Sequence, residues 1–201
     1  MKKVIAGLVM AVGLTGMVQA GDADRGADLV GTCAACHGQG GKQPIMDTYA
    51  RLSGLGERYI YEQLLDIKAG DRHIPEMTGI LDNNSDQDLK DMAAYYNAQE
   101  MPEDEASADL VDAGEQLYRG GNLSSGVAAC AACHGPAGQG NEPAGYPRLG
   151  GQKAAYTEKQ LRAYRNGDRV YDANSQIMGS IASRLTDEEI EAVSDYLQGL
   201  Y

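Results

Sequence analysis

The chain has 201 residues, 43% of them hydrophobic, and a formal net charge of −12 at pH 7. This negative charge argues against nucleic acids and anionic membrane surfaces as partners, because both would repel the protein. Only three histidines are present, which leaves little material for proton-transfer catalysis. Tryptophan and phenylalanine are absent, so few large side chains can fill a core.

The first 20 residues have the features of a secretory signal peptide. Two lysines precede an apolar run at residues 4–18, and Val18-Gln-Ala20 is a small-residue cleavage site. A membrane anchor is the alternative, but the run is short for a span of about 20 residues and glycines interrupt it. We expect cleavage after Ala20, which removes two lysines and leaves a soluble exported chain of net charge −14.

A first helix is predicted at residues 23–32, running toward the motif Cys33-Ala-Ala-Cys36-His37. Cys-x-x-Cys-His is the attachment sequence for haem c, in which both thiols add to the haem vinyl groups and the histidine is the proximal iron ligand. A structural disulfide and a redox dithiol are alternatives in an exported protein. Neither explains the histidine, so covalent haem is favoured.

A second helix is predicted at residues 58–69, where large side chains recur at helical spacing before Gly70. The loop after it contains Met77. The last helix of this half begins at Ser85-Asp-Gln-Asp88, a variant capping box whose side-chain oxygens satisfy free backbone N–H groups. No alternating strand pattern is present, which predicts an all-α, loop-rich fold.

Residues 99–108 are acidic, contain Pro102 and read as an exposed linker. We place the boundary between two domains near residue 105. The expected domains are therefore residues 21–104 and 105–201.

The second half is a copy of the first. A shift of 97 residues superposes the first motif on Cys130-Ala-Ala-Cys133-His134, and the register holds without gaps for about 40 residues. The equivalent helices are predicted at residues 109–119 and 155–166, and the last begins at Thr186-Asp-Glu-Glu189. A zinc site of four thiolates is disfavoured, since the two cysteine pairs lie in separate copies. Nine residues at 120–128 and four before Met178 are insertions, expected in surface loops.

The copies single out two methionines as sixth iron ligands. Met178 is the only methionine of the second half and aligns with Met77. A thioether is a common partner for histidine in electron-transfer haems, because it raises the reduction potential. Any single methionine is ordinarily core filler, but both copies retain this one in what reads as a glycine-rich loop. His73, the rival in the first half, has no counterpart and is interpreted as a surface residue.

Other equivalent positions support weaker predictions. Arg51 and Arg148 are candidates for pairing with haem carboxylates and equally for ordinary surface positions. Gly26 and Gly114 are expected to let the first and last helices of each copy cross closely. Arg72 and its equivalent in the second copy are interpreted as part of a turn after the second helix.

With these motifs the chain resembles the cytochrome c4 family, in which two class I cytochrome c domains are fused. The resemblance covers essentially the whole chain after residue 20. It rests on these motifs and their second-half equivalents: Cys33-Ala-Ala-Cys-His-Gly, Arg51-Leu-Ser-Gly, Tyr59-x-x-x-Gln-Leu, Lys68-Ala-Gly-Asp-Arg, Met77, and Met92-Ala-Ala-Tyr-Tyr. It implies two covalently bound haem c groups, histidine and methionine ligation of both, and haem propionates that face each other across the domain interface.

The resemblance also implies a role. Members are periplasmic and carry electrons from quinol-oxidising or dehydrogenase complexes to terminal oxidases. The chain is therefore expected to be an electron carrier and not an enzyme. It is expected to be a monomer or homodimer, with at most peripheral membrane association through its partners. A cytochrome subunit of a dehydrogenase complex, for example in sulfur-compound oxidation, is the main alternative. A dihaem peroxidase is a third, and would need an open iron site.

One departure from the family pattern concerns the proximal histidines. Pro147-Arg-Leu-Gly matches the family stretch whose proline carbonyl accepts a hydrogen bond from the proximal histidine, whereas the first half has Ala50 at that place. The approach to Met77 is also shorter than the approach to Met178. We therefore expect the two haems to differ in reduction potential.

Overall fold

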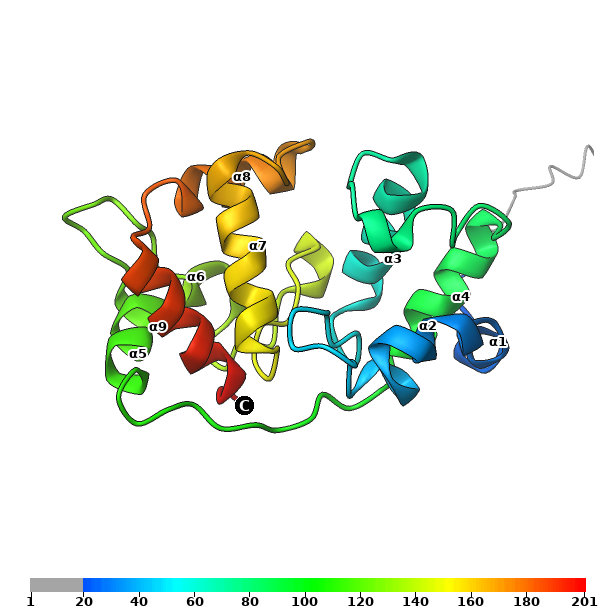
Figure 1. Ribbon diagram of the computed structural model, residues 1–201, viewed down its shortest axis with the longest axis horizontal. Coiled ribbons are helices and arrows are strands. Elements are labelled where there is room, and N and C mark those ends of the chain that lie inside the picture. The colour runs from blue at the N-terminus through cyan, green and yellow to red at the C-terminus, as the bar shows by residue number, and fades with distance from the viewer. Residues whose placement is uncertain (1–19) are drawn as a thin grey trace, which may run out of the picture.

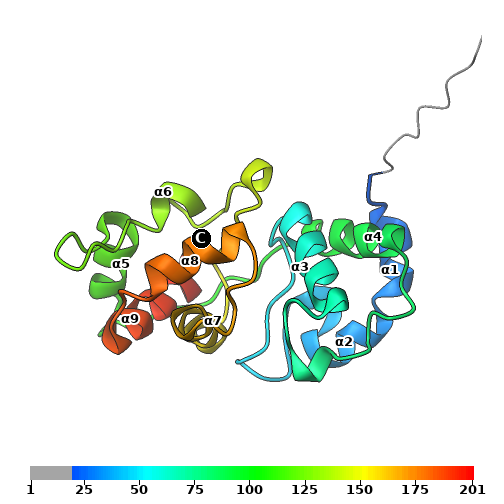
Figure 2. The same cartoon turned by 90° about the horizontal axis from the view of Figure 1, so that it is seen from above.

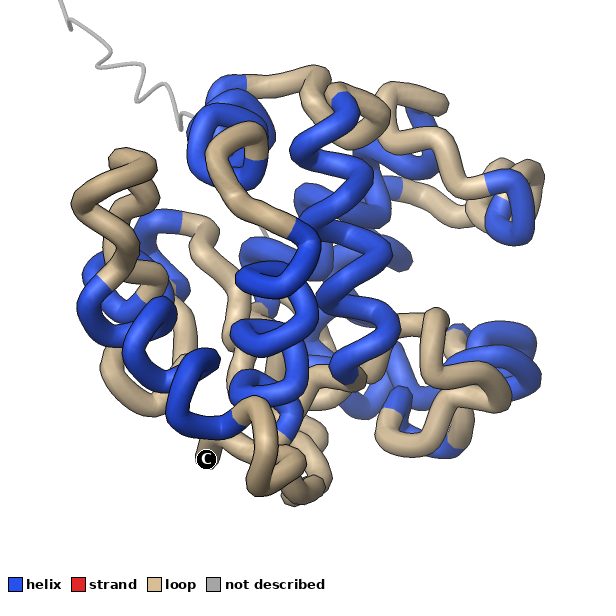
Figure 3. Tube along the Cα trace, turned by 60° about the vertical axis from the view of Figure 1, so that its left-hand side comes forward, coloured by secondary structure: helices blue, strands red, loops and turns tan. Residues whose placement is uncertain are grey.

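The computed structural model describes residues 20–201 and shows two helical lobes side by side, joined by an extended segment along one edge (Figures 1 and 2). The predicted signal peptide, apart from Ala20, lies outside the described residues. Helices and loops make up the described part (Figure 3), and its only β pairing is two isolated bridges, Asn122 with Val127 and Asn141 with Tyr146. The predicted all-α fold is confirmed. Within residues 20–201, no helix has the length and apolar character needed to cross a bilayer.

The first lobe follows the predicted order with one difference. Its elements are α1 (Ala23–Leu29), α2 (Gly31–His37), η1 (Gln39–Gly41), α3 (Glu57–Ala69), η2 (Pro75–Met77) and α4 (Asp86–Asn97). The single helix predicted at 23–32 is wrong, because the chain turns at Val30, buries that side chain and starts a second helix. That second helix carries the whole cysteine motif.

The second lobe repeats this order with shifted details. Its elements are α5 (Val111–Gly120), α6 (Ala131–His134), η3 (Glu142–Ala144), α7 (Ala154–Asn166), α8 (Ala173–Ala182) and α9 (Asp187–Gln198). The insertion at 120–128 is only partly a surface loop, since Leu123 at its tip is 94% exposed whereas Val127 is buried in the core. The four inserted residues before Met178 help to form α8, so the loop predicted there is wrong.

Capping boxes start the last helix of each lobe. The Ser85 hydroxyl accepts from the Asp88 amide while the Asp88 carboxylate accepts from the Ser85 amide, and Thr186 with Glu189 repeats the pattern. Each pair satisfies two backbone donors that a helix terminus otherwise leaves free. These local bonds fix where α4 and α9 begin, as predicted from the sequence.

Each lobe is held by a close crossing of its first and last helices. In the second lobe α5 crosses α9 at Gly114, where an added Cβ atom would overlap the Ala192 carbonyl oxygen and the Cβ of Tyr196. In the first lobe α1 crosses α4 in the same way, with Gly26 against Asp91. The predicted role of both glycines is confirmed.

We expect Gly114→Ala to lower the free energy of unfolding of the second lobe by roughly 1–3 kcal/mol, since the methyl group forces α5 and α9 apart. Gly120→Ala, on the same helix, is the matched control. No atom lies within 4 Å of its added Cβ, so it should be neutral or stabilise the helix by roughly 0.5–1 kcal/mol. Urea unfolding of both variants measures this, and equal losses at the two positions would contradict the crossing as the cause.

Candidate functional site

Each lobe contains an apolar cavity that collects the predicted haem residues of its own half. The first, of about 250 Å³, is lined by Cys33, Cys36, His37 and Met77. The second, of about 190 Å³, is lined by the equivalent residues Cys130, Cys133, His134 and Met178. Aliphatic and aromatic side chains of the two core clusters also line both cavities. Residues up to 44 positions apart in the first lobe and 48 in the second thus meet at one site.

The histidines of the two Cys-x-x-Cys-His motifs are oriented by backbone carbonyls. His37 Nδ1 lies 2.9 Å from the Ala50 carbonyl oxygen, and His134 Nδ1 lies 2.9 Å from that of Pro147. A carbonyl can only accept, so Nδ1 carries the proton and Nε2 keeps a free lone pair. Burial lowers the pKa of both imidazoles and so favours their neutral form. The hydrogen bond to the carbonyl raises the pKa, but its effect is smaller than that of burial. Ala50 therefore makes the same contact that proline makes in the second lobe.

None of the four cysteines forms a disulfide in this structure. Burial raises the pKa of Cys33, and it raises the pKa of Cys130 to about 11. A redox dithiol needs a lowered pKa in an electropositive setting, so this environment does not suit that alternative. Within the described ranges, no three His, Cys, Asp or Glu side chains gather as a metal-binding cluster.

The sixth-ligand candidates occupy different local structures. Met77 ends the short turn η2, in a loop as predicted. Met178 lies on helix α8, which contradicts the predicted loop. The cause is a second capping box, Asp172 with Ser175, which starts a helix where the sequence resembles an inserted turn. Both methionines are half-buried and line their cavities. His73 is exposed at the edge of the first cavity, in agreement with its interpretation as a surface residue.

The two cavities adjoin at the domain interface. Six residues line both of them: Leu55, Tyr59, Gln63, Tyr156, Gln160 and Arg169. These include both members of two duplicated pairs, Tyr59 with Tyr156 and Gln63 with Gln160. In Figure 1, helices α3 and α7, which carry these pairs, face each other between the lobes.

Two buried arginines bind across this interface in a reciprocal pattern. Arg169 donates to Tyr59 and Gln63 of the first lobe at 2.8 Å each, and Arg72 donates to Tyr156 and Gln160 of the second at 3.2 and 3.3 Å. Both arginines lie in the turn predicted after the second helix, but the interpretation missed that they are buried and bind across the interface. Tertiary contact decides their role, and their only sequence signal was recurrence at the 97-residue shift.

The arginines singled out from the sequence lie elsewhere. Arg51 is 2% exposed and uses its guanidinium on the Lys42 and Gly151 carbonyls and on Asp104, so it is neither a surface residue nor part of the cavity lining. Arg148 is half-buried, lines the second cavity and donates to the Gly150 carbonyl at 2.9 Å.

The residues present fit a covalently bound haem in each cavity. Two thiols, an imidazole with a free Nε2 lone pair and a thioether are the donor set of a c-type haem. Arg169 Nε is buried without an acceptor, at a wall that both cavities share. An anionic group beside it, such as a haem carboxylate, would satisfy this donor.

Comparison with known proteins agrees with this reading. The family model "Cytochrome c" matches residues 111–201, and the model "Cytochrome C oxidase, cbb3-type, subunit III" matches residues 21–95. The chain is 47% identical to cytochrome c4 of Stutzerimonas stutzeri over the full length of both. The crystal structure of reduced recombinant cytochrome c4 from Pseudomonas stutzeri superposes with a TM-score of 0.87 at 47% identity, covering 90% of this chain and 100% of that one.

A more distant relative has a more specific name. The "Thiosulfate dehydrogenase electron acceptor" of Stutzerimonas stutzeri is 36% identical, over 82% of this chain and 76% of its own length. Two cytochrome c domains with two Cys-x-x-Cys-His motifs carry two covalently bound haem c groups, which confirms the predicted cofactors. Full-length identity, domain content and superposition together show that the chain belongs to the cytochrome c4 family.

Proposed function

We propose that the chain is a periplasmic dihaem electron carrier, with residues 21–104 and 105–201 as its two domains. The first haem is attached at Cys33 and Cys36, with His37 and Met77 as axial ligands. The second is attached at Cys130 and Cys133, with His134 and Met178 as axial ligands. The observation that carries the proposal is the meeting of two cysteines, a histidine and a methionine in one cavity of each lobe.

The bound haem supplies an iron that is reversibly oxidised and reduced by one electron. The chain's own residues do the rest. The Ala50 and Pro147 carbonyls orient the imidazoles, and the apolar walls exclude water. Arg72 and Arg169 supply positive charge for the haem carboxylates. Because a histidine and a methionine would both ligate each iron, the residues favour electron transfer over the peroxidase alternative.

The partners are redox proteins. We propose a quinol-oxidising complex or a dehydrogenase as the donor and a terminal oxidase as the acceptor, with the carrier a monomer or homodimer. The net charge of −12 supports docking on basic surfaces of such partners. The same negative charge argues against nucleic acids as partners.

The second candidate function is the cytochrome subunit of a sulfur-compound dehydrogenase complex. The relative named as a thiosulfate dehydrogenase electron acceptor favours it. In that case the same chain accepts electrons from a tightly bound catalytic partner.

Purification of the protein from periplasm tests the proposal. We expect a mature chain without residues 1–20, two covalently bound haems, and uptake of two electrons per chain on reduction. A membrane preparation with terminal oxidase should reoxidise it without peroxide turnover. Copurification in fixed ratio with a catalytic subunit would instead favour the second function, and fewer than two reducible haems would contradict both.

A further inference from the structure

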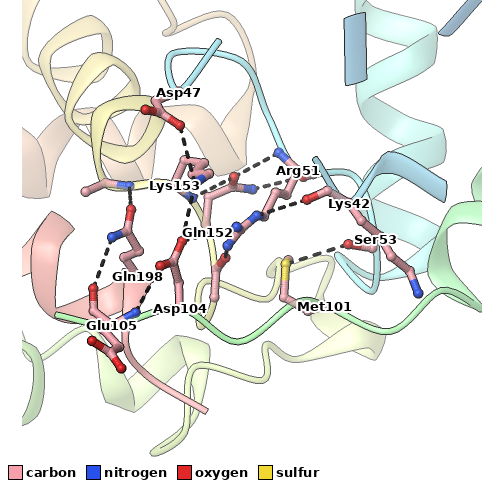
Figure 4. Close-up of polar contacts among 12 residues, drawn as sticks. Lys42, Asp47, Arg51, Ser53, Met101, Asp104, Glu105, Gln152, Lys153 and Gln198 are labelled. Atoms are coloured by element: carbon pink, nitrogen blue, oxygen red, sulfur yellow. Dashed lines mark hydrogen bonds and ion pairs between the residues drawn. The ribbon is translucent and has the colours of Figure 1, made fainter. Parts of the chain in front are cut away.

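The carbonyl that orients His37 belongs to a peptide group with a second, interdomain contact. The Ala50 carbonyl oxygen accepts from His37 Nδ1 at 2.9 Å. The N–H of the same peptide group is that of Arg51, and it donates to Gln152 Oε1 of the second lobe, also at 2.9 Å (Figure 4). One peptide group therefore connects the first-lobe histidine to a side chain of the other domain.

Gln152 is fixed in this position. Its Nε2 donates back to the Arg51 carbonyl at 2.9 Å, and its Oε1 accepts a further bond from the Lys153 amide at 3.0 Å. The Arg51 guanidinium donates to the neighbouring Gly151 carbonyl at 2.6 Å. Gln152 is 4% exposed, so water does not compete for these bonds.

The second lobe has an equivalent connection, but its last hydrogen bond is longer. His134 donates to the Pro147 carbonyl at 2.9 Å, and the amide of that peptide group, from Arg148, donates to the Leu55 carbonyl of the first lobe at 3.2 Å. Each proximal histidine is thus linked through one peptide group to the opposite domain. The acceptors differ. For the first lobe the acceptor is the buried side-chain amide of Gln152, and for the second it is the Leu55 backbone carbonyl at a longer distance.

Hydrogen bonds in series strengthen one another. Donation by the Arg51 N–H draws electron density toward the Ala50 carbonyl oxygen, which then accepts more strongly from His37 Nδ1. A stronger bond at Nδ1 makes the imidazole a better donor through Nε2. A more electron-rich axial ligand stabilises the oxidised iron and lowers the reduction potential. Gln152 also restrains the peptide group that lacks the proline ring present in the second lobe.

We propose that Gln152 is a positioning residue for His37, acting through the Ala50–Arg51 peptide group to lower the reduction potential of the first haem. This inference rests on the proposed function, since it requires His37 to ligate that haem. It makes the potential of one domain dependent on its packing against the other.

The test uses the full holoprotein with Gln152→Met, which keeps the side-chain length and removes the amide. In an NMR-monitored redox titration, signals from each domain report its own haem. We expect the reduced-to-oxidised ratio of the first haem at a fixed potential to rise by roughly threefold to tenfold. Tenfold corresponds to a rise in its midpoint potential of about 59 mV for a one-electron couple. Gln152 also lines the second cavity, so the second midpoint is expected to shift too, but by a clearly smaller factor than the first. The His37 Nδ1–H resonance should move upfield as its bond weakens.

Two further variants make the test specific. Gln198→Met is the matched control, because Gln198 also bridges two backbone groups, Ala154 and Glu105, without contacting either histidine's peptide group. It should move neither midpoint. Gln152→Glu restores an oxygen acceptor for the Arg51 amide, and should return the His37 Nδ1–H resonance to its wild-type position or further downfield.

An unchanged first midpoint in Gln152→Met would overturn the inference. So would equal shifts of both midpoints, or the same shift in Gln198→Met, because Gln152 would then serve only domain packing. Failure of the proposed function looks different, since the wild-type protein would then lack two separately reducible haems.

Discussion

Replacing both Cys130 and Cys133 by alanine is expected to give a chain with one covalently bound haem in place of two, and uptake of one electron per chain on reduction. The two cavities are lined by separate cysteine pairs, so the attachment chemistry of the first lobe is untouched. The second lobe should also lose stability. Its empty cavity of about 190 Å³ costs up to roughly 5 kcal/mol at about 24 cal/mol per Å³.

The measurements are the mass of the intact protein, haem absorbance per chain and urea unfolding followed separately in each domain. Cys33→Ala with Cys36→Ala is the mirror-image control, which should lose the other haem and destabilise the other lobe. Retention of two haems in either double variant, or loss of both, would contradict independent attachment in the two domains.

Met178→His is expected to lower the midpoint of the second haem by a substantial part of the roughly 0.8 V that axial ligands span. Methionine favours the reduced iron through its soft sulfur, whereas a second imidazole favours the oxidised iron. Helix α8 holds residue 178 at the cavity, so histidine can be presented from the same backbone position. The weak red absorption band of methionine-to-iron coordination should fall to half, which the oxidised spectrum measures.

Met46→His controls for the introduction of a histidine. Met46 is 51% exposed and lines neither cavity, so this variant should keep both midpoints and the full absorption band. An undiminished band in Met178→His would show that another residue is the axial ligand of the second haem.

Local patterns in the sequence predicted much of the fold. The capping boxes at Ser85 and Thr186 act within one helical turn, and their helices begin where predicted. Recurrence at a fixed shift identified the two lobes, and the requirement for close helix crossing identified Gly26 and Gly114. The capping boxes depend only on neighbouring residues, and the other signals depend on comparing the two copies. The sequence contains both kinds of information.

Features decided by contact between the lobes were missed. Arg72 and Arg169 each bind residues of the opposite domain as well as a glutamine of their own, and nothing in the surrounding sequence distinguishes them from other turn residues. The role of Gln152 was missed for the same reason, since its partner Arg51 lies 101 residues away in the sequence. The helical position of Met178 was missed for a local reason, because Asp172 and Ser175 can start either a turn or a helix.

The shared wall between the cavities has a consequence for how such a duplicated gene can evolve. A substitution at Tyr59, Gln63 or Arg169 alters the surroundings of both haems at once, because each residue borders both cavities. Along this surface the copies must therefore change in concert. At the outer end of the second lobe, where the loop between α5 and α6 lies far from the other domain (Figure 1), they are free to diverge.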